Sequence, residues 1–248
     1  MQNPYLRNKF YLYGSKIILL FVFILAAQGI SHAQKFTYAR RNNPNYDLRK
    51  LSYGFLIGLH TTAYQIKYSD SFVRPIPPND SLYAIEPQWS PGFALGFIVN
   101  YRIADFFDLR LTPNFAFYEH RLKYRFTNTT QEQLIETVMV EVPLLLKYKS
   151  ERRGNIRMYM VGGASVGLEA SGKKQIENSS EGIDVQGTNI SLQMGFGFDL
   201  YYPLFKFSPE LRFSRGITNM LDNTKYTIYG DPLSRINTNT ITLYLLFQ

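Results

Sequence analysis

Cysteine is absent from this 248-residue chain, and only three histidines and one tryptophan occur. Without cysteine, the chain has no disulfide framework, no thiol nucleophile and no cysteine-based zinc site. It also lacks the His-Glu-x-x-His and His-x-x-Glu-His zinc motifs, and its glycine pairs lack the lysine and following helix of a phosphate-binding loop. Beyond residue 27, no uninterrupted run of about 18 apolar residues marks a membrane-spanning helix. The composition therefore predicts neither a metal centre nor a cofactor site.

The first 33 residues have the order of charge and hydropathy that is typical of a signal peptide. Arg7, Lys9 and Lys16 precede an apolar run over residues 17–27, and residues 31–33 (Ser-His-Ala) place small side chains where a signal peptidase cleaves. The apolar run is shorter than the roughly 20 residues that a spanning helix needs. We therefore predict export with cleavage of this leader, and an uncleaved anchor is the alternative.

The charge of the exported part is moderately positive. The net charge of +8 falls to +5 once the three cations of the leader are removed. A group of the remaining cations precedes the first predicted strand: Lys35, Arg40, Arg41, Arg49 and Lys50. On an exported chain, such a short basic segment is expected to meet anionic lipid or a protein partner, and no nucleic-acid partner is predicted.

The segment 189–201 alternates between apolar and polar residues almost without error. One parity carries Ile190, Leu192, Met194, Phe196, Phe198 and Leu200, and the other carries Ser191, Gln193, Gly195, Gly197 and Asp199. Because successive side chains of a strand point to opposite faces, the segment has one apolar face and one face of small and polar residues. In an exported chain, such an apolar face is predicted to turn outward into lipid. A soluble β-sandwich with an aromatic core is the alternative, but it leaves the inward glycines and charges unexplained.

Similar alternation elsewhere predicts about eight antiparallel strands, an even number as in most outer-membrane barrels. The segments that carry it are 52–67, 89–102, 109–117, 137–147, 159–161, 189–201, 207–214 and 241–247. Long polar connections alternate with short ones, which predicts long external loops, brief periplasmic turns and both termini in the periplasm. Tyrosines near the predicted strand ends are expected to form girdles at the membrane interfaces: Tyr53, Tyr64, Tyr68, Tyr101, Tyr118, Tyr124, Tyr148, Tyr201 and Tyr202.

The predicted fold is therefore all-β, an antiparallel transmembrane barrel of about eight strands in the outer membrane, behind a signal peptide. The expected domains are a signal peptide over 1–33, a periplasmic segment over 34–51 and the barrel over 52–248. Closure of the sheet removes the edges that lipid could not satisfy.

The polar parity of the strands is predicted to line the lumen. Its candidate charge network consists of Arg110, Glu141, Asp199, Glu210 and Arg212, with Arg102 and Lys147 on the same face. An eight-stranded barrel is just wide enough for side chains to fill it, and an unpaired buried charge costs several kcal/mol, so opposite charges there are expected to pair. Glycines on this face are expected to make room for the long Arg and Glu side chains: Gly54, Gly58, Gly92, Gly96, Gly195 and Gly197. An ion pathway lined by Arg110 and Glu141 is the alternative.

Only His60 and His120 remain once the leader is removed, so any enzymatic function depends on them. His120 lies near the outer end of the third predicted strand beside Glu119, and it is the one candidate general base. On a continuous strand Glu119 and His120 point to opposite faces, which argues against a simple dyad. We predict a protein without catalytic activity, and a lipid A-modifying barrel enzyme that uses His120 is the alternative.

Five short motifs are distributed along the chain from Tyr46 onward. They are Asn45-Tyr46-Asp47, Phe55-x-Ile57-Gly58 followed by His60, residues 141–148 (Glu-Val-Pro-Leu-Leu-Leu-Lys-Tyr), Gly162-Gly163, and residues 209–214 (Pro-Glu-Leu-Arg-Phe-Ser) with Gly216. Together they resemble the PorT family of outer-membrane β-barrel proteins of Bacteroidetes bacteria. The last two motifs are shared by many small barrels of this phylum, and the first ones are more specific to PorT.

The resemblance implies a part in type IX protein secretion and gliding motility. Proteins of this family are required for the export of cargo with a C-terminal sorting domain. A barrel of eight strands is too narrow to pass folded cargo, so an accessory or assembly role is expected. The implied partners are outer-membrane lipid and other secretion-system proteins, with protein contacts expected at residues 35–50 and in the long loops. A generic structural outer-membrane barrel is the competing interpretation.

Overall fold

The computed structural model describes residues 41–73, 82–127, 129–170, 185–221 and 232–248. Residues Arg41–Gln248 form one compact unit, and the predicted signal peptide lies outside the described residues. The strands are β1 (Leu51–Tyr68), β2 (Leu82–Gln88), β3 (Ser90–Arg102), β4 (Phe107–Leu111), β5 (Asn114–Phe126), β6 (Thr130–Lys149), β7 (Ile156–Glu169), β8 (Thr188–Tyr201), β9 (Lys206–Gly216) and β10 (Leu233–Phe247). Two one-turn helices accompany them, η1 (Tyr46–Leu48) and α2 (Asp70–Val73). Among the described residues, no helix is long and apolar enough to cross a membrane.

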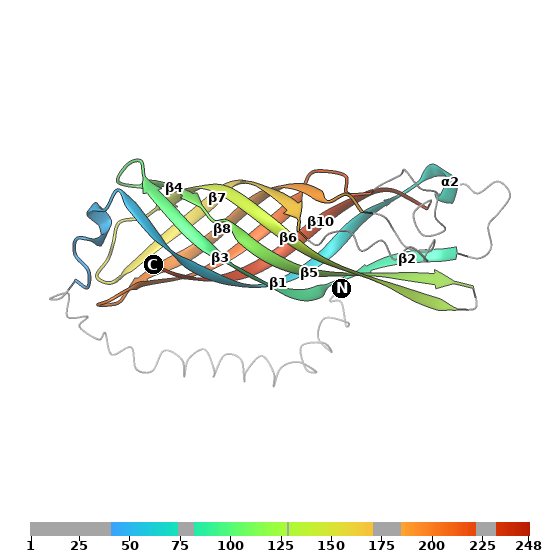
Figure 1. The fold of residues 1–248 in the computed structure, drawn as a ribbon, viewed down its shortest axis with the longest axis horizontal. Helices are drawn as coiled ribbons and strands as arrows, with labels where there is room; N and C mark the ends of the chain where they lie inside the picture. Colours follow the sequence, from blue (N-terminus) through green and yellow to red (C-terminus); the bar gives the residue numbers. More distant parts are fainter. Residues whose placement is uncertain (1–40, 74–81, 128, 171–184, 222–231) are drawn as a thin grey trace, which may run out of the picture. The chain divides into compact units, whose positions relative to one another are not determined.

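The ten strands form a closed antiparallel ring of eight, because two pairs of strands are continuations of one another. β2 leads into β3 at Trp89, and β4 leads into β5 at Thr112 and Pro113, where proline interrupts the ladder. β1 pairs with β10 on one side and with β3 on the other, which closes the sheet. Figure 1 shows the strands running diagonally around the barrel. The predicted all-β barrel of about eight antiparallel strands is confirmed.

The register around the ring defines how far the strands are staggered. A circuit through paired residues starts at Thr61 and passes Ile241, Phe213, Met194, Gly162, Leu146, Leu109 and Tyr101. It returns to β1 at Leu51, ten residues closer to the amino terminus than where it began. A stagger of this kind requires strands that are tilted by roughly 35–45° to the barrel axis.

In the central part of the barrel, the outer surface carries the apolar parity of the strands. In β8, Leu192, Met194 and Phe196 are all more than half exposed, whereas Ser191 and Gln193 face inward and are buried. The apolar residues of this strand extend over 190–198, which matches the roughly 9–11 residues of a tilted transmembrane strand. The outward orientation predicted for this segment is therefore confirmed. We call this outer apolar surface the belt.

The tyrosines predicted to form two interfacial girdles divide into two groups. Tyr53, Tyr101, Tyr148 and Tyr202 point outward near the end of the barrel that carries the short turns, and they are 44–77% exposed. Tyr64, Tyr124 and Tyr201 are at most 4% exposed, and Tyr118 bonds a lumen carboxylate. Tyr68 packs against a buried apolar cluster and donates to the Ile85 carbonyl at 2.8 Å. These five therefore lie inside, and the girdle prediction is wrong for them. Their parity within each strand already indicated this orientation.

Two of the inward glycines, Gly58 and Gly197, make room for tyrosine rings, and not directly for the Arg and Glu side chains that were predicted to occupy the space. A Cβ atom at Gly58 would lie 2.7 Å from the ring of Tyr244, and one at Gly197 would lie 2.5 Å from the hydroxyl of Tyr159. These two rings form cation–π contacts with lumen cations. The Arg212 guanidinium lies 4.3 Å from the centre of the Tyr244 ring, and the Lys147 ammonium lies 3.8 Å from the centre of the Tyr159 ring.

This arrangement predicts a sharp difference between two glycines on adjacent strands. Gly197→Ala is expected to lower the free energy of unfolding by about 1–3 kcal/mol, because the new methyl group would also lie 2.7 Å from the backbone oxygen of Pro209. Gly162→Ala on the outer face of β7 meets no atom within 4 Å and is expected to change stability by less than about 0.5 kcal/mol. Urea unfolding of both variants in the same detergent measures the difference, and equal midpoints would contradict the close approach.

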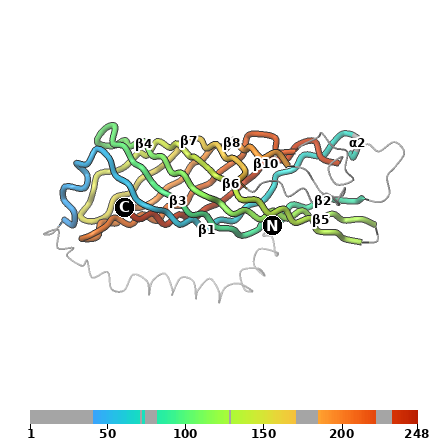
Figure 2. The backbone as a smooth tube through the Cα atoms, viewed as in Figure 1, coloured from blue at the N-terminus to red at the C-terminus, as the bar shows by residue number. Residues whose placement is uncertain are grey.

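Three strands project beyond the rest of the barrel at the end that carries the long loops. β2, β5 and β6 extend together there, as the right-hand side of Figures 1 and 2 shows. The predicted second strand began near Trp89 and the fourth near Thr137, so both predictions missed this extension. A buried apolar cluster that includes Tyr64, Ile85, Leu122 and Ile236 fills this end of the barrel. Apolar residues inside the extension interrupt the simple rule of an apolar exterior and a polar interior.

Candidate functional site

A chain of buried ion pairs occupies the middle of the lumen. The Arg110 guanidinium donates to a Glu210 carboxylate oxygen at 2.5 Å, and Arg212 donates to the other oxygen at 2.5 and 2.9 Å. All three side chains are at most 2% exposed. Asn100 accepts from Arg110 at 2.7 Å and Gln193 accepts from Arg212 at 3.2 Å, so neutral groups take up further donors of the two cations. One terminal nitrogen of Arg110 is buried without a hydrogen-bond partner among the described residues. Glu210 thus pairs with two buried guanidinium groups at once, which leaves one net positive charge on these three side chains.

A second ion pair lies next to this chain, toward the short turns. Lys147 donates to Asp199 at 2.6 Å, and the Ser208 hydroxyl donates to the other Asp199 oxygen at 2.6 Å. The Lys206 ammonium is 3.9 Å from the same carboxylate. The Tyr159 ring connects the two groups, because Arg110 and Lys147 both lie over it. We call Arg110, Glu210, Arg212, Lys147 and Asp199 the lumen network.

Glu141 is not joined to this network by an ion pair among the described residues. It is 7% exposed and accepts a hydrogen bond of 2.7 Å from the Tyr118 hydroxyl. The structure therefore does not place Arg110 and Glu141 side by side along a path, since Arg110 bonds Glu210 and Glu141 bonds Tyr118. Arg102 lies at the mouth near the short turns, where it donates to the Asp47 carbonyl at 2.7 Å and pairs with Asp105.

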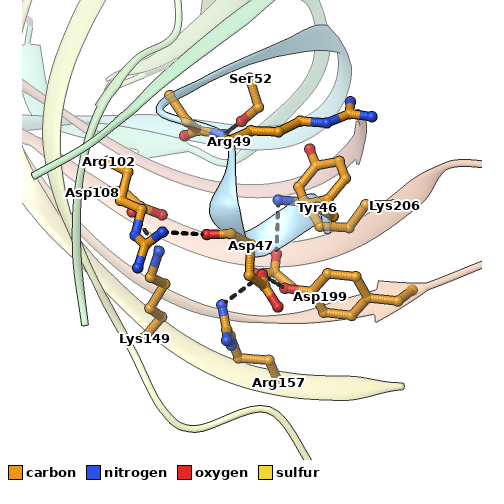
Figure 3. Close-up of a pocket in the computed structure, with 12 residues that line it drawn as sticks. Tyr46, Asp47, Arg49, Ser52, Arg102, Asp108, Lys149, Arg157, Asp199 and Lys206 are labelled. Carbon is orange, nitrogen blue, oxygen red and sulfur yellow. Dashed lines mark hydrogen bonds and ion pairs between the residues drawn. The ribbon is translucent and has the colours of Figure 1, made fainter. Parts of the chain in front are cut away.

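The helix η1 closes the mouth of the barrel at the end of the short turns. Figure 3 shows Asp47 pointing into the mouth, with Arg157 beside it. The Asp47 carboxylate accepts hydrogen bonds from Arg157 at 3.0 Å and from the Tyr201 hydroxyl at 2.8 Å. Arg152 lies 3.5 Å away on its other side. We call Tyr46–Leu48 the mouth plug.

Little space is left between the mouth plug and the lumen network. The pocket there has a volume of only about 20 Å³ and is lined by residues of both, including Asp47, Arg102 and Asp199. A water molecule needs roughly 10–15 Å³ when volume is measured in this way. Among the described residues, the mouth therefore has room for about one water molecule.

Several charged residues of the site were not among the sequence candidates. Lys149 donates to Asp108 at 2.5 Å, and Lys206 lies beside Asp199. Asp108 has the inward parity of Arg110, and Lys149 has the inward parity of Lys147. Extending the predicted third and fourth strands to these residues would have identified both as inward charges. Asp47 lies outside every strand, and periodicity gives no signal for it.

The two histidines lie in a stack of aromatic rings inside the barrel. The Tyr64 and His120 rings stack at 4.0 Å, the Tyr118 and His120 rings at 5.7 Å, and His60 contacts Tyr118 at 4.5 Å. His120 is 3% exposed, whereas Glu119 pairs with Arg121 on the opposite side of the strand. The imidazole of His120 therefore does not reach the outer rim, where a lipid substrate of an enzyme would lie.

Residues 163–167 (Gly-Ala-Ser-Val-Gly) match the Gly-x-Ser-x-Gly pattern of hydrolases, a match that the sequence reasoning missed. In those enzymes the serine occupies a sharp turn from a strand into a helix. Here Ser165 lies in the middle of β7, and its hydroxyl is buried without a hydrogen-bond partner in the described part of the chain. The context of a nucleophile elbow is missing. No group of three or more His, Cys, Asp or Glu side chains among the described residues could hold a metal ion.

The closed ring, the outer belt and the buried side chains of the lumen define a transmembrane β-barrel whose interior is occupied by side chains of the described residues. The chain matches the outer membrane protein beta-barrel domain family over residues 27–222. Because this match covers most of the sequence, the chain belongs to that family, and it is a protein of the outer membrane.

The chain is also similar to solved outer-membrane proteins at low identity. OprG from Pseudomonas aeruginosa is 12% identical, with a TM-score of 0.42 over 78% of this chain and 92% of that one. Neisserial surface protein A is 13% identical, with a TM-score of 0.39 over 80% and 98%. The attachment invasion locus protein Ail of Yersinia pestis is 12% identical, with a TM-score of 0.33 over 79% and 96%. The comparison with curated proteins finds no match.

Proposed function

We propose that this protein is a non-enzymatic outer-membrane barrel that acts as an accessory component of type IX protein secretion and gliding motility. The observation that carries the accessory role is the filled lumen, in which Arg110, Glu210 and Arg212 are buried against one another. A barrel occupied in this way has no conduit for cargo. Its contribution to secretion would therefore come from its ends and its outer surface.

The assignment to type IX secretion rests on the resemblance to the PorT family. Several residues of the shared motifs belong to the site: Asp47 of the mouth plug, and Lys147, Glu210 and Arg212 of the lumen network. The motifs thus describe how the interior of such a barrel is filled. They support membership of one structural group more directly than they support a particular secretion partner.

We also propose that the short-turn end, with both chain termini, faces the periplasm. The alternation of short and long connections supports this orientation, because periplasmic turns of such barrels are brief. Residues 42–47 are held by the barrel itself, since Asn42 and Asn43 donate to the Tyr201 and Tyr202 carbonyls at 3.0 and 2.9 Å. Contacts with a periplasmic partner would therefore use Arg41, Arg49 and Lys50, which are exposed, and the segment 34–40 that precedes them.

A deletion strain tests the proposal. Loss of the protein is expected to abolish secretion of cargo with a C-terminal sorting domain, and the full chain on a plasmid is expected to restore it. Removal of residues 34–40 leaves the described barrel intact and is expected to weaken secretion at normal barrel levels, if that segment binds a partner.

Two further readouts separate the competing functions. If the protein is a generic structural barrel, the deletion strain is expected to secrete normally and to have a weakened envelope. That result would contradict the secretion role. A lipid A-modifying enzyme predicts an altered lipid A mass spectrum in the deletion strain that His120→Ala fails to restore. We expect the lipid A mass to be unchanged in both strains, because His120 is buried in its aromatic stack.

A further inference from the structure

A basic groove lies on the outer wall of the barrel, just beyond the belt and toward the long loops. It has a volume of about 370 Å³. Its lining consists of Gln65, Ile66 and Lys67 of β1, Arg215 and Gly216 of β9, Ile217 directly after β9, and Arg235 and Asn237 of β10. Lys67, Arg215 and Arg235 are exposed. We call this feature the rim groove.

The register of three neighbouring strands brings these residues together. Gln65 is opposite Asn237, Lys67 is opposite Arg235, and Arg215 is opposite Asn239 on the other side of β10. All of them share the outward parity of the belt, whose last apolar residues on these strands are Leu59, Phe213 and Ile241. The rim groove therefore begins at the upper edge of the belt, and Ile217, which is 47% exposed, brings apolar surface into its lining. In the proposed orientation this edge is the level of lipid headgroups.

Hydrogen bonds hold the walls of the rim groove in place. Arg215 donates to the Gln65 side-chain oxygen at 2.9 Å, across β10. Arg235 donates to the Ile217 carbonyl at 2.7 Å, and Asn237 donates to the Gly216 and Thr218 carbonyls at 3.0 and 2.9 Å. Each guanidinium has five N–H donors and here uses one of them in the bonds described, so both arginines are oriented and keep donors for a ligand.

Exposed arginines on the projecting strands are paired differently. Arg121 is 2.6 Å from Glu119 and 3.9 Å from Glu132, and Arg125 is 2.9 Å from Glu86. In the rim groove, no acidic side chain of the described residues forms an ion pair with Lys67, Arg215 or Arg235. Within the described part of the chain, three positive charges therefore converge without a counter-charge, although the same protein supplies partners for the cations of the projecting strands.

We infer that the rim groove binds the phosphate groups of a phosphorylated outer-leaflet glycolipid of the lipid A type. Two arginine forks can each hold a phosphate through paired hydrogen bonds, and Lys67 adds a point charge. The acyl chains of the same lipid lie against the belt directly below, at Leu59, Phe213 and Ile241. This inference rests on the proposed orientation, which places the long-loop end in the outer leaflet.

Native mass spectrometry of the full chain in a zwitterionic detergent tests the site. The probes are diphosphoryl lipid A and its fully dephosphorylated form at equal concentration. Wild type is expected to retain the diphosphoryl lipid at least about tenfold better than the dephosphorylated one. The variant Lys67→Gln/Arg215→Gln/Arg235→Gln is expected to lose at least about tenfold of that binding, and Arg215→Gln or Arg235→Gln alone about fivefold.

The matched control is Arg121→Gln/Arg125→Gln, which removes two exposed arginines that have acidic partners, and its binding is expected to equal that of wild type. Equal retention of the two lipids by wild type, or an unchanged affinity in the triple variant, would overturn the site. Full competition by inorganic phosphate at the lipid's own concentration would overturn the lipid as its ligand. If the triple variant does not fold, the two single variants decide the question.

The orientation is tested separately, and the lack of native cysteine makes this simple. Thr129→Cys lies at the tip of the projecting hairpin, and Leu204→Cys lies in a short turn where the side chain is 94% exposed. In intact cells, a membrane-impermeant thiol reagent is expected to label only Thr129→Cys. Labelling of Leu204→Cys instead would overturn both the orientation and the outer-leaflet ligand. The two proposals can fail separately. If the orientation and the lipid binding are as expected but the deletion strain secretes normally, the lipid site is retained and only the secretion role is contradicted.

Discussion

Replacement of Glu210 by alanine is expected to lower the free energy of unfolding by about 3–5 kcal/mol. The carboxylate lies between Arg110 and Arg212, whose side chains are 0% and 2% exposed, and it is the one acid that pairs with either of them in the described part of the chain. Its removal leaves two like charges buried without a counter-charge, so the loss exceeds that of an ordinary surface ion pair.

The single tryptophan, Trp89, provides the signal for this measurement, because its half-exposed ring faces outward where β2 joins β3. Urea unfolding of the barrel refolded into detergent gives the two free energies. Glu132→Ala is the control: this acid also contacts an arginine, but both side chains are exposed, and the expected loss is at most about 1 kcal/mol. Similar losses in the two variants would mean that the lumen network does not hold buried charge.

Met194→Arg is expected to destabilise the membrane-inserted barrel by about 2–4 kcal/mol. Met194 is 65% exposed on the outer face of β8, in the middle of the apolar residues of that strand, so an arginine there must enter the centre of the hydrocarbon layer. The cost depends on depth, because it falls to about 0–1 kcal/mol near the interfaces.

Reversible unfolding in lipid vesicles measures this effect, with Leu204→Arg as the control. Leu204 is an exposed apolar residue in the turn between β8 and β9, outside the belt, so its replacement is expected to be nearly neutral. In detergent micelles, which adapt around a charge, the difference between the two variants is expected to shrink. An equal and small effect of both in vesicles would contradict the assignment of the outer face to lipid.

The barrel could be predicted from the sequence because its wall repeats one simple rule. In the central part of the barrel, apolar residues point outward and mostly small or polar residues point inward, and in β8 that rule holds from Ile190 to Asp199. The same rule identified Arg110, Glu141, Asp199, Glu210 and Arg212 as inward residues, because parity alone decides which face a side chain occupies.

What the sequence could not supply are the partners across the lumen. Arg110 is 100 residues from Glu210 in the chain, and their contact depends on the stagger of the strands, which alternation does not reveal. The mouth plug was missed as a part of the site for a related reason. Asp47 is positioned by contacts with Arg157 and Tyr201, which are far away in the sequence. The extension of β2 was missed because Pro87 and an irregular register near Ala84 break its pattern.

The closure of the ring by β1 and β10 has a consequence for how the protein is made. These strands pair from Phe55 with Phe247 to Tyr68 with Leu233, so the seam joins two segments that are far apart in the chain. Until β10 is available, β1 and β9 both present rows of unpaired backbone groups that a lipid interior does not tolerate. Insertion therefore cannot proceed strand by strand alongside translation. The chain must be carried, unfolded and complete through residue 247, to the membrane before the wall can close.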